Sequence, residues 1–259
     1  MRLLLSVLLL VLSVPSVAAE APLRFSVADS WSMPLMQSDI NGPRDGFLFD
    51  IMQSLSRQVG RKAEYHVLAR MRVQSALERG EIDVRCYAAQ SWMPNMSGDY
   101  LWSPPLMTQR DLLISTADHL APVHVEQLQD KTIGTVLGYT YPHLQQLFDS
   151  HQLQREDARN QELVLQKLQA GRYHYAVGNE WSLNWFNRNL PPERRLHAVS
   201  IIEEQAVGCV VRNNADVPTQ WILRTLLKMK MSGEIEQIIQ RYGADPVPLP
   251  VEQFAPAER

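Results

Sequence analysis

Cysteine is nearly absent from this chain, which has two among 259 residues, Cys86 and Cys209. They lie far apart and form no CxxC pair, so the sequence offers neither a thiol redox motif nor a cysteine zinc site. The seven histidines are scattered, and no two lie four residues apart as in zinc hydrolases. A glycine-rich phosphate loop and a nucleophile–base pair are also missing. We therefore expect no metal, no cofactor and no enzymatic activity.

Neither sign of charge is in large excess. The chain has 25 Lys and Arg against 28 Asp and Glu, a net charge of −3, and its basic residues form no cluster. Such a balance gives no reason to expect nucleic acid or an anionic membrane surface as a partner. The 45% hydrophobic and 20% charged residues are ordinary for a globular protein.

Long apolar runs are missing beyond the N-terminus. There, Arg2 precedes a short apolar run, Leu3–Leu12, and the small residues Val17-Ala18-Ala19 follow. This is the pattern of a cleaved secretory signal peptide. The run is short of the roughly 20 residues of a membrane span, which disfavours the alternative of a retained anchor. We assign residues 1–19 to a signal peptide and expect a periplasmic mature protein.

Strand and helix patterns alternate along the mature chain. A β-α-β-α-β order in the first block predicts a parallel sheet covered by helices. Its predicted elements are Leu23–Ala28, Phe47–Val59, Glu64–Leu68, Val73–Arg79 and Ile82–Ala88.

A second block repeats this pattern and predicts a sheet of its own. Its strands are Asp111–Ser115, Thr132–Leu137, Tyr173–Gly178 and Leu196–Ser200, and its helices are Tyr141–Phe148, Leu163–Ala170 and Trp181–Asn187. A strand, Val207–Val211, and two helices, Pro218–Lys230 and Glu234–Tyr242, follow. Residues 246–259 are proline-rich and predict a loose tail. Two β/α blocks indicate two lobes with a cleft between them.

Four segments resemble the extracellular solute-binding proteins of ABC transporters, in the class that binds polar amino acids. They are Gly46-Phe47 with Asp50, the run from Ala76 to Val84, Trp102-Ser103-Pro104-Pro105, and Gly233 to Gly243. A shorter segment, Leu128–Gly134, resembles the start of the family's second lobe. The order and spacing of these segments, from Leu23 to Gly243, make the resemblance specific.

The resemblance implies a two-lobed α/β fold of the periplasmic binding protein type. Each lobe would hold a mixed, mainly parallel sheet flanked by helices, with a two-strand hinge between the lobes. Lobe one would span 20–107 and 206–245, and lobe two 108–205. A small polar or anionic solute would bind between the closing lobes of a monomer, for delivery to an inner-membrane ABC permease.

The family's usual ionic contacts to an amino acid are missing here. By resemblance, an arginine after the third strand binds the ligand's carboxylate, and a lobe-two aspartate binds its ammonium group. Asn95 stands at the first position, and Asn179, followed by Glu180, stands at the second. We therefore expect a ligand that is not a standard α-amino acid held by this pair.

Other residues near the expected cleft are candidates for ligand contact. Arg70 stands where the family commonly has an aromatic residue, and we hypothesise that it binds an anion; a solvated arginine is the alternative for it and for Arg72. The remaining candidates follow predicted strands or precede a helix: Asp29, Trp31, Ser32, Gln90, Ser91, Trp92, Tyr139 and Thr140. Core packing of Trp31 and helix capping by Thr140 remain as alternatives.

The implied topology places the strands of Cys86 and Cys209 side by side. A disulfide and two buried thiols both remain open, because neighbouring strands do not always satisfy disulfide geometry.

Two alternative functions remain. Cyclohexadienyl dehydratases use the same scaffold and would need a general acid, for which Glu180 and Asp29 are the candidates. A sensory protein that docks on a membrane receptor would share every feature above.

Overall fold

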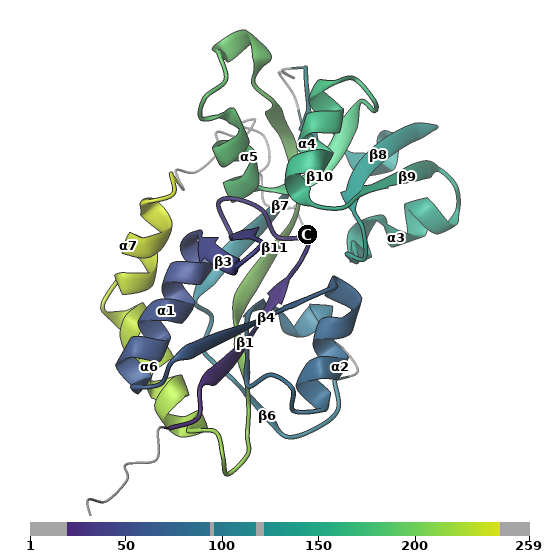
Figure 1. The fold of residues 1–259 in the computed structure, drawn as a ribbon. Helices are drawn as coiled ribbons and strands as arrows, with labels where there is room; N and C mark the ends of the chain where they lie inside the picture. Colours follow the sequence, from purple (N-terminus) through teal and green to yellow (C-terminus); the bar gives the residue numbers. More distant parts are fainter. Residues whose placement is uncertain (1–19, 94–95, 118–121, 244–259) are drawn as a thin grey trace, which may run out of the picture.

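The computed structural model describes residues 20–93, 96–117 and 122–243. The predicted signal peptide, the tail 246–259 and the candidate Asn95 lie outside these residues. Within them, the α/β fold has two lobes joined by two long strands (Figure 1). No helix of this described part is long and apolar enough to cross a membrane.

Lobe one is built around three parallel strands in the order β4-β1-β5. Their bounds are β1 Leu23–Ala28, β4 Ala63–Leu68 and β5 Val84–Ala88, and the connecting helices are α1 Phe47–Val59 and α2 Val73–Glu78. Helix α1 forms because Phe47, Ile51 and Leu55 recur at helical spacing and are all buried. It ends at Gly60, which adopts the left-handed conformation that favours glycine.

Two C-terminal helices complete lobe one. Helices α6, Thr219–Met231, and α7, Glu234–Gln240, pack on α1 (Figure 1). Together they bury one continuous core that includes Phe25, Leu48, Ile222 and Ile238.

Lobe two is built around the strands β10-β8-β9, which pair in parallel. The strands are β8 Lys131–Val136, β9 Leu153–Ala158 and β10 Tyr175–Asn179, and the helices are α3 Pro142–Asp149, α4 Gln161–Gln169 and α5 Glu180–Asn187. Separate apolar clusters are centred on Val164 and Leu168 and on Leu144 and Leu153. Short 3-10 turns at Val125–Gln127 and Pro192–Arg194 complete the lobe.

Two strands pass from one lobe to the other. They are β7, Met107–Ser115, and β11, His197–Arg212, which pair with each other in antiparallel fashion. The sequence predicted two strands, Leu196–Ser200 and Val207–Val211, where the structure has the single 16-residue β11. The prediction was wrong because the polar stretch Glu203-Glu204-Gln205 has no hydrophobic pattern of a strand, although it belongs to a strand that crosses between the lobes. The expected boundaries at 107/108 and 205/206 fall inside these two strands.

Four further strands were not predicted. A hairpin, β2 Gln37–Asp39 and β3 Gly42–Asp45, precedes α1, and β6, Tyr100–Trp102, pairs with β11. The fourth is β9, at the edge of the lobe-two sheet. Its sequence LQREDA has a buried residue only at each end, so no hydrophobic alternation marks it as a strand.

Strands β5 and β11 are joined by a disulfide between Cys86 and Cys209, which lie opposite each other in register. Both cysteines are buried in the lobe-one core. The covalent bond therefore ties the third parallel strand to a strand that leads into lobe two.

Candidate functional site

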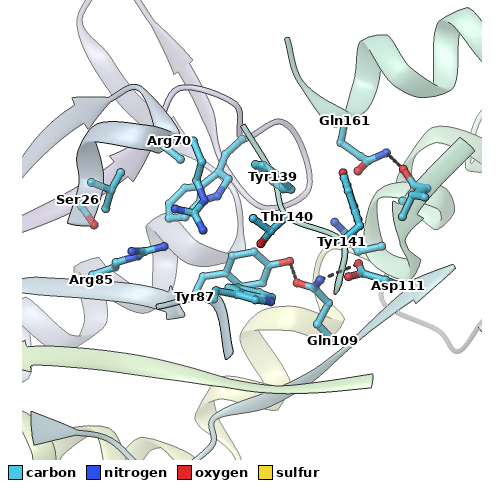
Figure 2. A pocket seen from close by; sticks show the side chains of 17 residues that line it. Ser26, Arg70, Arg85, Tyr87, Gln109, Asp111, Tyr139, Thr140, Tyr141 and Gln161 are labelled. Atoms are coloured by element: carbon cyan, nitrogen blue, oxygen red, sulfur yellow. Dashed lines mark hydrogen bonds between the residues drawn. The ribbon is translucent and has the colours of Figure 1, made fainter. Parts of the chain in front are cut away.

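A pocket lies between the two lobes, at the ends of strands from both (Figure 2). It encloses about 690 Å³ of space, part of which is open to solvent. Lobe one contributes Ser26, Ala28, Trp31, Arg70, Val73, Arg85, Tyr87 and Trp92; the crossing strand β7 contributes Gln109 and Asp111; lobe two contributes Tyr139, Thr140, Tyr141, Gln161, Val177, Gly178 and Asn179.

Six of the residues proposed from the sequence line this pocket: Trp31, Arg70, Trp92, Tyr139, Thr140 and Asn179. Each follows a strand or lies in the turn before a helix, where parallel α/β sheets place ligands. Tyr141, rather than Thr140, occupies the N-cap position of α3, and no side chain caps that helix. The structure therefore gives Thr140 no capping role.

Six other candidates lie outside the lining: Asp29, Ser32, Arg72, Gln90, Ser91 and Glu180. Asp29, Arg72 and Gln90 are exposed. Ser91 donates a hydrogen bond to Gln205 Oε1 over 2.9 Å. Glu180 lies 3.5 Å from the Arg110 guanidinium, and burial raises the pKa of its carboxyl. Sequence position alone could not separate a strand end facing the pocket from one facing solvent.

Arg70 lies in the 3-10 turn Arg70–Arg72 of lobe one and faces lobe two. Its guanidinium carbon lies 5.9 Å from the centre of the Tyr139 ring, a cation–π contact between the lobes. Burial lowers the pKa of Arg70, and the described residues place no carboxylate within salt-bridge distance of it. The side chain is thus a cation held in the pocket without a counter-charge.

Arg85, which sequence analysis missed, lies on β5 and is only 4% exposed. Burial, and secondarily the charge of Arg70, lower its pKa to about 9. Its Nη1 has no hydrogen-bond partner among the described residues. One signal was available in the sequence, because a charged residue inside the buried run Val84–Ala88 is unusual.

Asp111, also missed, stands on β7 on the opposite side of the pocket from Arg85 (Figure 2). Its Oδ1 accepts a hydrogen bond from Gln109 Nε2 over 2.7 Å, and Gln109 Oε1 accepts one from the Tyr87 hydroxyl. Burial raises the pKa of Asp111 to about 7, and the neighbouring Glu203 adds to the rise. This carboxyl can therefore gain or lose a proton near neutral pH.

Aromatic residues complete the walls. Trp31 and Trp92 each pack edge-on against Tyr87, and Tyr139 receives a 3.3 Å hydrogen bond from Ser30 of lobe one. Asn179 caps α5, since its Oδ1 accepts from the Ser182 amide over 2.9 Å. The pocket thus offers flat apolar surfaces and a few directed polar groups, the usual make-up of a small-molecule site.

The described residues include no group of three or more His, Cys, Asp or Glu that could hold a metal ion. What the pocket presents is two arginines without counter-charges, one carboxyl on the far side and aromatic walls. Arginine binds carboxylates and other oxyanions through parallel N–H donors. The arrangement is therefore suited to holding an anionic solute.

Comparison with known proteins supports the family resemblance and the fold. The model of the bacterial extracellular solute-binding proteins, family 3, matches residues 23–245. A search of curated proteins finds no match.

Solved structures share the fold. An ancestral arginine-binding protein bound to arginine superposes with a TM-score of 0.69 and 19% identity, covering 88% of this chain and 100% of that one. The GluR0 ligand-binding core in complex with L-glutamate has a TM-score of 0.71 and 15% identity, covering 87% of this chain and 99% of that one. A histidine kinase sensor domain with similarity to periplasmic binding proteins has a TM-score of 0.69 and 19% identity, covering 88% of this chain and 99% of that one.

Proposed function

The chain belongs to the bacterial extracellular solute-binding proteins of family 3, and from this premise we propose that it binds a small anionic solute in the periplasm for delivery to an ABC permease. The observation that carries the proposal is Arg70, a cation without a counter-charge in the pocket between the lobes. An anion bound there would touch both lobes at once, because Arg70 already contacts Tyr139 across the gap. Such a ligand favours the closed arrangement by differential affinity.

The neighbouring structures that bind arginine or glutamate support a ligand of amino-acid size. Asn179 supports a departure from the family's ordinary ligands, because its Oδ1 is used to cap α5 and it brings no negative charge. We propose a monomer that binds and releases its solute unchanged. Glu180, one of the two candidates for a general acid, is paired with Arg110 outside the pocket lining. Asp29, the other, is exposed and also lies outside it.

Thermal-shift screening of the mature protein tests the proposal, since a ligand that binds the native state raises its apparent stability. We expect carboxylates and other organic anions to raise the melting temperature and neutral analogues to raise it less. Arg70→Ala should abolish most of the shift, whereas Arg72→Ala should retain it, because Arg72 lies in the same turn but is exposed and away from the pocket. Equal shifts in both variants would contradict an anion site at Arg70.

Transport and sensing predict the same binding and differ in the partner. Transport requires that the loaded protein stimulate ATP hydrolysis by a permease–ATPase complex encoded beside it. Deletion of the gene should then abolish uptake of the radiolabelled solute. A cell that keeps uptake but loses a transcriptional response to the solute would show a sensory role instead.

A further inference from the structure

The lobe-one end of the pocket holds two buried polar groups that the protein itself does not satisfy. Ser26 on β1 is 1% exposed and Arg85 on β5 is 4% exposed, and both line the pocket. Among the described residues, neither Ser26 Oγ nor Arg85 Nη1 has a hydrogen-bond partner. A buried donor left without a partner destabilises the folded protein, and more so when it is charged.

Two other arginines of the same lobe are neutralised by a carboxylate of the chain. Arg24, on β1 beside Ser26, and Arg212, on β11, both bind Asp83 Oδ1, at 2.6 and 2.8 Å. Arg85 is more deeply buried than Arg24 and has no such carboxylate. The contrast indicates that the partner of Arg85 comes from outside the chain.

Arg70 brings a second positive charge to the same end of the pocket. The two guanidinium groups are close enough for the charge of Arg70 to lower the pKa of Arg85. The only carboxyl in the described lining is Asp111, on the opposite side (Figure 2). Two positive charges therefore face the same space with no negative charge beside them.

We propose that Ser26, Arg85 and Arg70 form a subsite for a doubly charged anionic end of the solute, either a pair of carboxylates or a phosphonate or phosphate group. The Ser26 hydroxyl and the Arg85 guanidinium donate to its oxygens at the floor, and Arg70 closes over it from the rim. This subsite rests on the proposed solute-binding function and adds the charge of the ligand to it.

Isothermal titration with probes that differ by one charge tests the subsite. A suitable pair is succinate against succinamate, with 3-phosphonopropionate as the phosphonate probe. We expect the wild-type protein to bind at least one doubly charged probe tenfold or more tightly than its singly charged partner. The preferred member of the set distinguishes a dicarboxylate from a phosphonate ligand.

Variants assign this preference to residues. Arg85→Gln should lower the affinity for the doubly charged probe by about 30-fold or more and lower the affinity for its singly charged partner much less. Arg85→Lys should recover part of the lost affinity, which would show that the loss in Arg85→Gln comes from the missing charge and not from misfolding. Ser26→Ala should lower the affinity for the doubly charged probe about tenfold. Ser32→Ala is the matched control, because Ser32 Oγ is also buried and unpartnered but lies outside the pocket lining, and it should leave affinity unchanged.

The outcomes separate the two proposals. Preference for a doubly charged probe that survives both Arg85→Gln and Ser26→Ala would overturn the subsite while the binding function stands. Binding of neutral solutes only, displaced by none of the anions, would overturn both the subsite and the anionic character of the proposed solute. A wild-type protein whose pocket binds no solute of any charge would overturn the binding function itself.

Discussion

At the scale of single residues, Arg85 combines a proposed role in binding with a cost in stability. The sequence around it, Val84-Arg85-Cys86-Tyr87, is predicted simply as a buried strand, and its single signal is the presence of a charged residue in that strand. Its role emerges only when β1 and β11 flank β5 and enclose the side chain. Residues at predicted strand ends, such as Trp31 and Asn179, were easier to find because their position alone suggests the cleft.

Replacing Arg85 by methionine should stabilise the ligand-free protein. Burial lowers the pKa of Arg85 to about 9, so the side chain stays charged at neutral pH but its charge is less stable in the folded protein than in water, and a neutral side chain of similar length removes that cost. We expect Arg85→Met to raise the free energy of unfolding by about 1–3 kcal/mol at pH 7, measured by urea denaturation. A loss of stability of that size would show that Arg85 has a structural partner. The gain should reverse when a bound anion stabilises the wild type.

The raised pKa of Asp111 predicts that the stability of the protein depends on pH. Its pKa is raised from an ordinary 3.8 to about 7, so the folded protein holds a proton that the unfolded chain releases between these values. The contribution of Asp111 to stability is therefore complete below about pH 4 and is lost as pH rises to about 7. Asp111→Asn should stabilise the protein at pH 8 by on the order of 2 kcal/mol and have little effect at pH 4.

Thermal denaturation of the Asp111→Asn variant between pH 4 and 8 measures this difference. Asp157→Asn is a suitable control, since Asp157 accepts hydrogen bonds from Thr135 and Arg155 outside the pocket. An Asp111 effect that is constant across this range would contradict the assigned protonation.

At the scale of elements, helices were predicted more accurately than strands. The pattern of α1 depends on its own sequence, with buried residues at helical spacing and a glycine at its end, and predicted and observed bounds agree. Strand β11 depends on its partners instead. Its central residues are polar because they cross between lobes, and only the pairing with β7 keeps them extended. The β2–β3 hairpin likewise has no buried face that a sequence pattern could show.

The disulfide between β5 and β11 should contribute substantially to stability. It closes a loop of 123 residues, and disulfides across long loops stabilise by about 2–4 kcal/mol. We expect the double variant Cys86→Ala/Cys209→Ala to lose that amount in urea denaturation. The wild type should lose a similar amount under reducing conditions, and the variant should not respond to the reductant. An equal response of both proteins would show that the bond does not form.

At the scale of the whole molecule, the lobes are packed against each other. Trp181, the second residue of the lobe-two helix α5, is 5% exposed and contacts Phe47 and Tyr87 of lobe one, with ring centres 5.3 and 6.1 Å apart. An added Cβ on Gly138 of lobe two would lie 3.5 Å from the Met71 side chain of lobe one. The structure is therefore that of a closed form.

Trp181→Ala should shift the ligand-free protein toward an open form. The substitution removes aromatic contact between the lobes, which is worth about 0.5–1.5 kcal/mol per ring pair beyond the buried area. We expect a larger radius of gyration in X-ray scattering and roughly tenfold weaker ligand binding. Trp221→Ala provides the control, because Trp221 is 52% exposed on α6 and should change neither quantity. Unaltered scattering in the Trp181 variant would mean that this contact does not hold the lobes together.

The pairing of β7 with β11 shifts register between Ile201 and Glu203, and Glu203 lies opposite Asp111. A register shift of this kind bends the strand and increases its local twist. We expect the crossing ribbon to flex at this joint, which lies beside Asp111, the carboxyl that lines the pocket. A molecule bound against Asp111 would stiffen this joint directly. Ligand occupancy and the angle between the lobes would then be coupled at this point of the ribbon, and amide hydrogen exchange on β11 would slow first at this point.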